Sequence, residues 1–289
     1  MTVGVIGLGR MGAPIAGRIA DVRGPVIGHD SRSDLVRVPR GVQLTDLATL
    51  ARTADIVVLS LPDAKVVLGV VDAFVACPDR KASVVVDCST IGVHGAEDAD
   101  TALRAAGITY VDAAVSGGVR GAEEGTLTAM CACDEAAFAT VESLLATFTS
   151  CRTRVGDRPG LGQAAKLANN FLSATALAAT SEAIAFGERL GIDPVRLLEV
   201  LNTSSGRNTA TADKFPRHVL TGSFAAGFSN VMMHKDVALY RESSVDAKTS
   251  IGRVVEEIWR AFAGAEPGAD ITRVHPYLQA RTNDPGEPR

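Results

Sequence analysis

The sequence predicts an α/β amino-terminal domain with a doubly wound, mostly parallel sheet, then a long interdomain helix and an all-α carboxyl-terminal domain. Short apolar runs alternate with helical patterns through the first half of the chain, and a glycine-rich turn joins the first apolar run to the first helix. Beyond residue 159 nearly every pattern is helical. For a chain of 289 residues we therefore expect two domains, over residues 1–158 and 159–289.

The composition argues against several classes of function. The net charge of −4 provides no positive surface of the kind that binds nucleic acid or an anionic membrane. No apolar run reaches membrane-spanning length, and no charged leader precedes the first strand pattern, so we expect a cytoplasmic protein. The five cysteines form no C-x-x-C pair, which argues against a disulfide framework or a structural zinc. We predict no metal, no nucleic-acid partner and no membrane partner.

The first strand is expected over residues 3–7, and Gly7-Leu8-Gly9-Arg10-Met11-Gly12 leads from it into a helical pattern. Gly7 permits a tight turn, Gly9 lets the backbone approach a pyrophosphate, and Gly12 lets the helix pack closely on the strand. The amino terminus of the helix then offers N–H groups to the phosphates. We therefore predict that these six residues bind a dinucleotide rather than form a plain turn.

A second strand is expected over residues 25–30 and ends in Asp30, which lies 18 residues after Gly12. That spacing suits the carboxylate that accepts hydrogen bonds from the adenosine ribose hydroxyls. A carboxylate there would repel a 2′-phosphate, so NAD is favoured over NADP. Arg32 and Arg37 follow and could reverse the preference, and Asp30 could instead be a turn residue.

Further strands are expected over residues 55–62, 83–90, 108–112 and 126–132, most of them separated by helical patterns. Ligands of such sheets bind beyond the carboxyl ends of the strands. Leu61 and Pro62 stand at one of these ends and Ser89-Thr90 at another, so we predict that Leu61, Pro62 and Thr90 contact the cofactor. The alternative for Ser89-Thr90 is that they cap the next helix.

Residues 112–127 hold the sequence Ser116-Gly117-Gly118, directly after a strand pattern. Successive backbone N–H groups and one hydroxyl can hold a carboxylate. A long loop without a ligand fits the same glycine content, and the residues alone leave both interpretations open.

A long helix is expected from residue 160 to about residue 189, and Lys166 and Asn170 project from the same face of it. Small residues at 164, 165 and 168 leave room on this helix for a ligand, so we predict that the cofactor meets the substrate here. Taken alone, Lys166 is more often a solvated lysine on an amphipathic helix than a catalytic residue. Lys235-Asp236 occurs in a later apolar run, where the plainer interpretation is a surface ion pair.

Four blocks of this sequence, in the same order, resemble the β-hydroxyacid dehydrogenases, of which the 3-hydroxyisobutyrate dehydrogenases are the best-known group. The blocks are residues 5–12, residues 112–118 continuing to 125–127, residues 160–170, and Lys235-Asp236. The resemblance implies a Rossmann domain, a long interdomain helix, and an all-α domain that carries much of the oligomer contact. A homodimer or homotetramer is therefore expected.

The resemblance also implies roles for individual residues. Lys166 would be the catalytic lysine of the K-x-x-N-N block, and the substrate would contact Asn170, with Asn169 beside it. The substrate carboxylate would bind at Ser116, Gly117 and Gly118, while the cofactor would touch Thr90 and Lys235. NADP-using members often carry Asn-Arg-Ser/Thr after the second strand, whereas this chain has Asp30-Ser31-Arg32, which agrees with NAD.

Two related groups and one departure complete the resemblance. Imine reductases share the fold but usually lack the lysine, so Lys166 argues against them. The 6-phosphogluconate dehydrogenases share the K-x-x-N-N block but are longer than this chain. The departure is Cys131-Ala132-Cys133, where many members have a valine and glycines.

The function expected from the whole sequence is reversible oxidation of a small 3-hydroxy acid to its semialdehyde or keto acid, with NAD or NADP. Lys166 would take the hydroxyl proton, because burial and a nearby positive charge both disfavour an ammonium and so favour a lysine base. Two alternatives remain: a physiological reductase of a small aldehyde or imine, and a non-catalytic NAD-responsive binding protein. Lys166 and Asn170 together argue against the second, which needs no proton donor.

Overall fold

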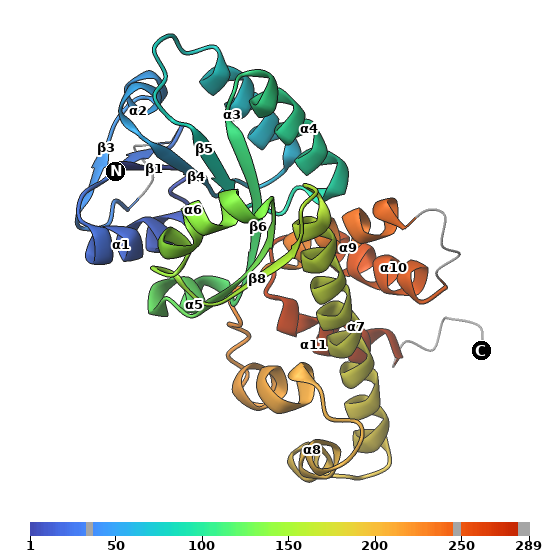
Figure 1. Ribbon diagram of the computed structural model, residues 1–289. Coiled ribbons are helices and arrows are strands. Elements are labelled where there is room, and N and C mark those ends of the chain that lie inside the picture. Colours follow the sequence, from blue (N-terminus) through green and yellow to red (C-terminus); the bar gives the residue numbers. More distant parts are fainter. Residues whose placement is uncertain (33–36, 245–249, 283–289) are drawn as a thin grey trace. The chain divides into compact units, whose positions relative to one another are not determined.

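The computed structural model describes residues 1–32, 37–244 and 250–282 (Figure 1). The chain separates into two compact units, Met1–Lys166 and Leu167–Arg289, which we call unit 1 and unit 2. Helix α7 (Leu161–Arg189) is continuous across this division, so its first turn groups with unit 1 and the remainder with unit 2. The domain boundary between residues 158 and 159 stays a prediction.

The described residues of unit 1 form an eight-stranded sheet in the order β3-β2-β1-β4-β5-β6-β7-β8. Neighbouring strands are parallel except β6 and β7, which are antiparallel, so the predicted doubly wound, mostly parallel sheet is confirmed. The strands are β1 (Val3–Ile6), β2 (Val26–His29), β3 (Val42–Leu44), β4 (Ile56–Leu59), β5 (Val84–Asp87), β6 (Thr109–Ser116), β7 (Leu127–Ala132) and β8 (Thr149–Gly156).

The two edge strands, β3 and β8, were not expected from the sequence. β3 has only three residues, and β8 is polar and largely exposed over most of its length. An edge strand pairs on one side only and needs no continuous apolar run, so neither strand carries the pattern by which buried strands are recognised. The strand expected over residues 108–112 also extends further than predicted, because β6 continues to Ser116.

Helices cover both faces of the sheet and enclose two apolar cores (Figure 1). One face packs on α1 (Gly12–Arg23), α5 (Gly118–Glu124) and α6 (Glu135–Leu145), and its core includes Ile15, Val141 and Phe148. The other face packs on α2 (Leu47–Thr53), α3 (Ala64–Val75) and α4 (Gly92–Ala105).

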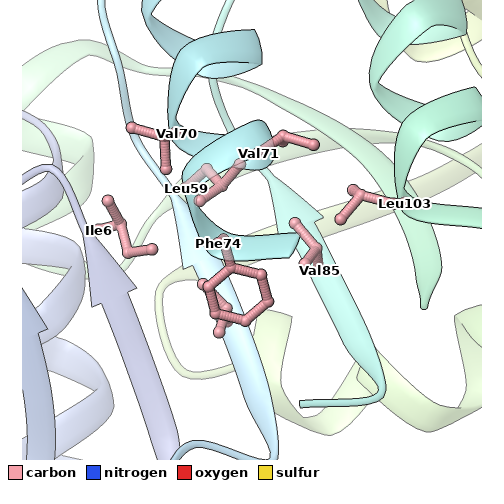
Figure 2. A pocket seen from close by; sticks show the side chains of 8 residues that line it. Ile6, Leu59, Val70, Val71, Phe74, Val85 and Leu103 are labelled. Atoms are coloured by element: carbon pink, nitrogen blue, oxygen red, sulfur yellow. The ribbon is translucent and has the colours of Figure 1, made fainter. Parts of the chain in front are cut away.

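A small void lies between α3, α4 and this second face of the sheet (Figure 2). Every side chain that lines it is apolar: Ile6, Val57, Leu59, Val70, Val71, Phe74, Val85 and Leu103. Ligand sites combine an apolar wall with a few polar groups that orient the ligand, and this void has no such group. It is therefore part of the core and not a substrate site.

Unit 2 is helical, as predicted. After α7 come α8 (Pro194–Thr203), a π-helix (Ala210–Val219), α9 (Asn230–Ser243), α10 (Ser250–Ala265), a short 3₁₀ turn (Ile271–Arg273) and α11 (Val274–Thr282). Trp259 is fully buried in their common core and donates its indole N–H to the carbonyl of Ala174 on α7, over 3.3 Å. In the described part of the chain, none of the helices is long and apolar enough to cross a membrane.

Candidate active site

The glycine turn between β1 and α1 is tightly packed against backbone atoms at two of its three glycines. A Cβ atom at Gly12 would lie 1.8 Å from the carbonyl oxygen of Gly7, and one at Gly7 would lie 2.3 Å from the carbonyl oxygen of Ser60. At Gly9, by contrast, a Cβ atom would meet no atom of the described chain within 4 Å. Gly7 and Gly12 are therefore required by the fold, whereas Gly9 borders open space, as expected where a pyrophosphate approaches the backbone.

Asp30, directly after β2, holds the glycine turn from the side. Its Oδ2 accepts a hydrogen bond from the Leu8 N–H at 2.8 Å, and its Oδ1 accepts one from the Arg32 N–H at 2.9 Å. Each carboxylate oxygen can accept a further hydrogen bond, so these contacts are compatible with ribose hydroxyls at the same group. The sequence suggested the ribose role but gave no sign that Asp30 also anchors the turn.

The carboxyl ends of β4 and β5 are tied together next to this turn. The backbone N–H of Leu61 donates to the Ser89 hydroxyl oxygen at 2.9 Å. Helix α4 begins after Ile91, and its first N–H groups bond to the side chain of Gln163 instead. The alternative in which Ser89 caps that helix is therefore wrong, and Ser89 bridges two strand ends. Leu61, Pro62 and Thr90 all follow these strand ends, on the edge of the sheet to which Gly7 belongs.

Ser116, Gly117 and Gly118 form the junction between β6 and α5. Ser116 is the last residue of β6, and α5 begins at Gly118. Gly117 and Gly118 have φ angles of 127° and 66°, which residues with a side chain rarely adopt, so this sharp junction depends on glycine. The stretch is strand, turn and short helix, and the alternative of one long loop is wrong.

The first turn of α7 is attached to the sheet by two residues that sequence analysis did not select, Asp112 and Gln163. Asp112 on β6 is fully buried and accepts hydrogen bonds from the backbone N–H groups of Gly160 and Gln163. The Gln163 side chain bonds to Asp112 and to backbone groups after β5. An aspartate on a distant strand and a glutamine inside a helix carry no local pattern that would reveal this connection.

Lys166 follows Gln163 on α7 and is 8% exposed, so it is not the solvated lysine of the plainer interpretation. Asn170, one helical turn further, is also buried. Its Nδ2 donates to Oδ2 of Asp236 on α9 at 2.6 Å, and its Oδ1 accepts from Nδ2 of Asn169 at 3.0 Å. Because a carboxylate only accepts hydrogen bonds, Asp236 determines which way the Asn170 amide faces.

The Lys235-Asp236 pair is not the exposed ion pair of the plainer interpretation. Asp236 is 2% exposed, and its Oδ1 lies 3.4 Å from Nζ of Lys235, whose side chain is 24% exposed. Asp236 is the third residue that sequence analysis missed as a partner of the site. Its position next to Lys235 in the family block was the available signal.

The two cysteines of the Cys131-Ala132-Cys133 departure are free and buried. Burial raises the pKa of Cys131 to about 12 and that of Cys133 to about 11, so both thiols stay protonated and are poor nucleophiles or metal ligands. In the described part of the chain, no three His, Cys, Asp or Glu residues are grouped to hold a metal ion.

The structure thus groups the selected residues in two sets. In unit 1, the glycine turn, Asp30, Leu61 and Thr90 lie at the carboxyl ends of β1, β2, β4 and β5, and Ser116 at that of β6. In unit 2, Asn170 is joined to Asp236 and so to Lys235. A doubly wound sheet whose first strand enters such a glycine turn is typical of dinucleotide-binding proteins.

Comparison with known proteins identifies the family within this class. Residues 2–156 match the family profile described as the NAD binding domain of 6-phosphogluconate dehydrogenase, and residues 160–278 match that described as NAD-binding of NADP-dependent 3-hydroxyisobutyrate dehydrogenase. A 3-hydroxyisobutyrate dehydrogenase from Pseudomonas aeruginosa is 33% identical over 296 residues, covering 96% of this chain and 99% of the relative. A 2-(hydroxymethyl)glutarate dehydrogenase from Eubacterium barkeri is 33% identical over 256 residues, covering 86% of this chain and 84% of the relative.

A solved structure gives the same result. The 3-hydroxyisobutyrate dehydrogenase of Mycobacterium tuberculosis, with L-serine, has a TM-score of 0.88 to this chain at 28% identity, covering 96% of this chain and 98% of that chain. The chain belongs to the β-hydroxyacid dehydrogenase family. The named relatives are hydroxyacid dehydrogenases, oxidoreductases that act on CH–OH groups, and the profiles indicate NAD or NADP as the cofactor.

Proposed function

We propose that this protein interconverts a small 3-hydroxy acid and the corresponding semialdehyde or keto acid with NAD or NADP, and that Lys166 is the general acid and base. The observation that carries the proposal is the buried Lys166 on α7, followed one turn later by the buried Asn170. A buried amine and a buried amide on one helix face suit a reacting oxygen that changes its proton.

The chain supplies a site that fits the dinucleotide. Gly9 borders open space between β1 and α1, and the amino terminus of α1 provides N–H groups for a pyrophosphate. Asp30 would bind the ribose, and Leu8, Arg10, Met11, Ser31, Arg32, Leu61, Pro62, Thr90 and Lys235 complete the proposed cofactor contacts. When bound, the nicotinamide ring supplies the acceptor or donor of hydride.

Lys166 handles the proton in both directions. In oxidation, the neutral amine at Nζ takes the proton from the substrate hydroxyl as the hydroxyl carbon loses its hydride. In reduction, the ammonium returns that proton to the carbonyl oxygen, so charge and protons balance over the cycle. Asn170 would hold the reacting oxygen in line with Lys166, and Asp236 would keep the Asn170 amide in one orientation.

The substrate carboxylate would be held by Ser116, Gly117 and Gly118. The Ser116 hydroxyl stands at the end of β6, and the glycine junction turns the backbone sharply before α5. Backbone N–H groups in such a turn, together with a hydroxyl, provide donors without a positive side chain. This arrangement favours small acids over uncharged alcohols.

The Lys166→Ala substitution tests the proposal. We expect kcat to fall on the order of a hundredfold or more with a 3-hydroxy acid, while the Kd for NAD stays close to that of the wild type, because the amine acts on the substrate. Turnover is measured by reduced-nicotinamide absorbance over a panel of 3-hydroxy acids at alkaline pH, and Kd by fluorescence titration.

A matched control is Lys81→Ala, which removes a half-exposed lysine paired with Asp55 at the other end of the strands and should leave kcat unchanged. If Lys166→Ala retained wild-type turnover, Lys166 would not be the acid and base. A wild-type protein that bound NAD but turned over none of the acids, and none of their aldehydes in reverse, would instead be an NAD-responsive binding protein.

A further inference from the structure

The amino terminus of α7 is capped by a side chain from a distant part of the sequence. Oδ2 of Asp112, on β6, accepts hydrogen bonds from the N–H groups of Gly160 at 3.0 Å and of Gln163 at 3.1 Å. These are N–H groups that the first turn of a helix cannot bond internally. A buried carboxylate therefore takes the place that Ser, Thr or Asp usually fills from the residue just before a helix.

Gln163 locks the same turn to the loop after β5. Its Oε1 accepts from the N–H groups of Ile91 at 2.9 Å and Gly92 at 3.2 Å, while its Nε2 donates to the Ser89 carbonyl at 3.1 Å and to Oδ1 of Asp112 at 2.9 Å. Both sides of the amide are thus fully used, and Gln163 is fully buried. Rotating the amide by 180° would oppose donor to donor and acceptor to acceptor at all four contacts.

Gly162 provides a second, independent sign that the turn is held at a set distance from the sheet. A Cβ atom at this position would lie 2.7 Å from Oδ1 of Asp112 and 2.7 Å from the carbonyl oxygen of Met130 on β7. Only glycine lets the α7 backbone approach these two oxygens so closely.

We propose that Asp112 and Gln163 are positioning residues for Lys166, holding the first turn of α7 against the ends of β5 and β6 so that the amine stands at one place relative to Ser89 and Thr90. Lys166 lies three residues after Gln163, less than one helical turn away. A shift of this turn therefore displaces the amine directly. The inference rests on the proposed role of Lys166 in catalysis.

The ionisation of Asp112 gives this arrangement a measurable signature. Burial raises the pKa of Asp112 to about 6, with a further rise from Asp87 on β5, against the lowering effect of the hydrogen bonds from Gln163 and Gly160. Asp112 in turn raises the pKa of four neighbouring titratable groups, Tyr110 on β6, Cys88 after β5, Cys131 on β7 and Cys133 just after it. Burial raises the pKa of each of these four, so they remain neutral near pH 6.

Protonation of Asp112 would disturb the cap, because both of its oxygens face N–H donors. A proton on either oxygen displaces one of the bonds to Gly160 or Gln163. We expect kcat in the direction of carbonyl reduction to fall as the pH drops below about 6. Carbonyl reduction is the informative direction, because Lys166 donates a proton in it and a lower pH does not remove that proton.

The decisive experiment is a double-mutant cycle on Asp112→Asn and Gln163→Glu. The Gln163→Glu change puts a second oxygen against the Ser89 carbonyl and the Asp112 carboxylate, so this variant alone should lower kcat tenfold to a hundredfold, with the Kd for NAD changed by less than about threefold. In the double variant, the amide introduced at position 112 donates to the carboxylate introduced at position 163 and still accepts from the two backbone N–H groups. Its kcat should exceed that of Gln163→Glu alone by about threefold or more.

The pH profile and a capping control separate positioning from stability. The acid limb near pH 6 should be absent from the Asp112→Asn enzyme, which has no carboxyl group to titrate at this position. Asp134→Ala removes the carboxylate that caps α6 through the Ala137 N–H, and should lower the melting temperature by about 2–4 °C with no change in kcat.

Two results would overturn the inference: a folded Gln163→Glu enzyme with wild-type kcat, or simple additivity of the two substitutions together with an unchanged acid limb. Failure of the proposed function looks different. In that case the wild type is inactive on every acid and aldehyde, or Lys166→Ala is as active as the wild type.

Discussion

Two helices of this protein begin with closely packed glycines, and they use them for opposite purposes. Helix α1 comes after Gly7, begins at Gly12, and has no capping side chain among the described residues. Helix α7 follows Gly160 and contains Gly162, and its first N–H groups are taken by Asp112. In α1 the glycines bring the helix end to open space at Gly9, whereas in α7 they bring the helix end onto a buried carboxylate.

This difference shows that the free N–H groups at the start of a helix can either stay available to a ligand or be bonded by another part of the fold. The positive end of a helix dipole attracts an anion in both cases. At α7 the protein itself supplies the anion, so the helix is held firmly and can carry Lys166. At α1 no side chain of the described residues takes that place, and in the proposed function the anion is the pyrophosphate of the cofactor. The sequence of a glycine motif does not show whether the helix end binds a ligand or is held by the fold. The contacts that each glycine makes in the structure do show it.

The largest expected effect comes from Gly12→Ala. The added Cβ would lie 1.8 Å from the Gly7 carbonyl oxygen, so α1 must move away from β1. We expect a loss of about 2–3 kcal/mol in the free energy of unfolding and a fall in NAD affinity of about a hundredfold, because the N–H groups at the start of α1 would move away from the proposed pyrophosphate site. Chemical denaturation and NAD titration measure the two quantities.

Gly9→Ala is the matched variant on the same turn, because its Cβ meets no atom of the described chain within 4 Å. It should keep the stability of the wild type in the absence of cofactor and lose NAD affinity by about tenfold or more. Equal NAD affinity in Gly9→Ala and the wild type would contradict the assignment of the α1 turn to the cofactor.

Most of unit 1 and the helical character of unit 2 could be predicted from the sequence, because buried parallel strands and helices carry apolar patterns of their own. The strands missed, β3 and β8, are edge strands that lie mostly at the surface and need no such pattern. The junction at Ser116 to Gly118 was left open, since glycines favour a loop as much as a turn into a helix.

For the proposed site, the sequence pointed to Lys166 and Asn170 because both stand in one block on one helix, and the structure finds both buried, while their roles stay predictions. Asp112, Gln163 and Asp236 act through partners 48 to 74 positions away in sequence, and no local spacing encodes such contacts. A buried aspartate or glutamine also has many structural roles, so its residue type alone does not indicate which one applies.

Gly162→Ala tests whether the close approach of α7 to Asp112 positions Lys166. Its Cβ would meet Oδ1 of Asp112 and the Met130 carbonyl at 2.7 Å, so the first turn of α7 must shift. We expect kcat to fall by about tenfold, because Lys166 is displaced, while the Kd for NAD remains that of the wild type. Steady-state kinetics and NAD titration check both values.

The control for this substitution is Gly69→Ala, in the middle of α3, where a Cβ would touch nothing within 4 Å in the described chain. It should raise the free energy of unfolding by up to about 1 kcal/mol and leave kcat unchanged. If Gly162→Ala weakened NAD binding as strongly as it lowered kcat, the two helix ends would not have separate functions.

The smallest expected effect concerns cofactor choice at Asp30, whose carboxylate combines the two uses at one position. Its charge would repel the 2′-phosphate of NADP, while its oxygens accept the Leu8 and Arg32 N–H groups. Asp30→Asn keeps an acceptor for the turn and removes the charge, so kcat/KM for NADP relative to NAD should rise about fivefold, the value of a solvent-screened charge pair. Asp30→Ala should shift the ratio equally but lower kcat/KM for both cofactors, because the Leu8 N–H loses its partner.

An unchanged ratio in both variants would transfer the discrimination between NAD and NADP to Arg32 or Arg37. An unchanged kcat/KM in Asp30→Ala would show that the glycine turn holds its shape without this anchor.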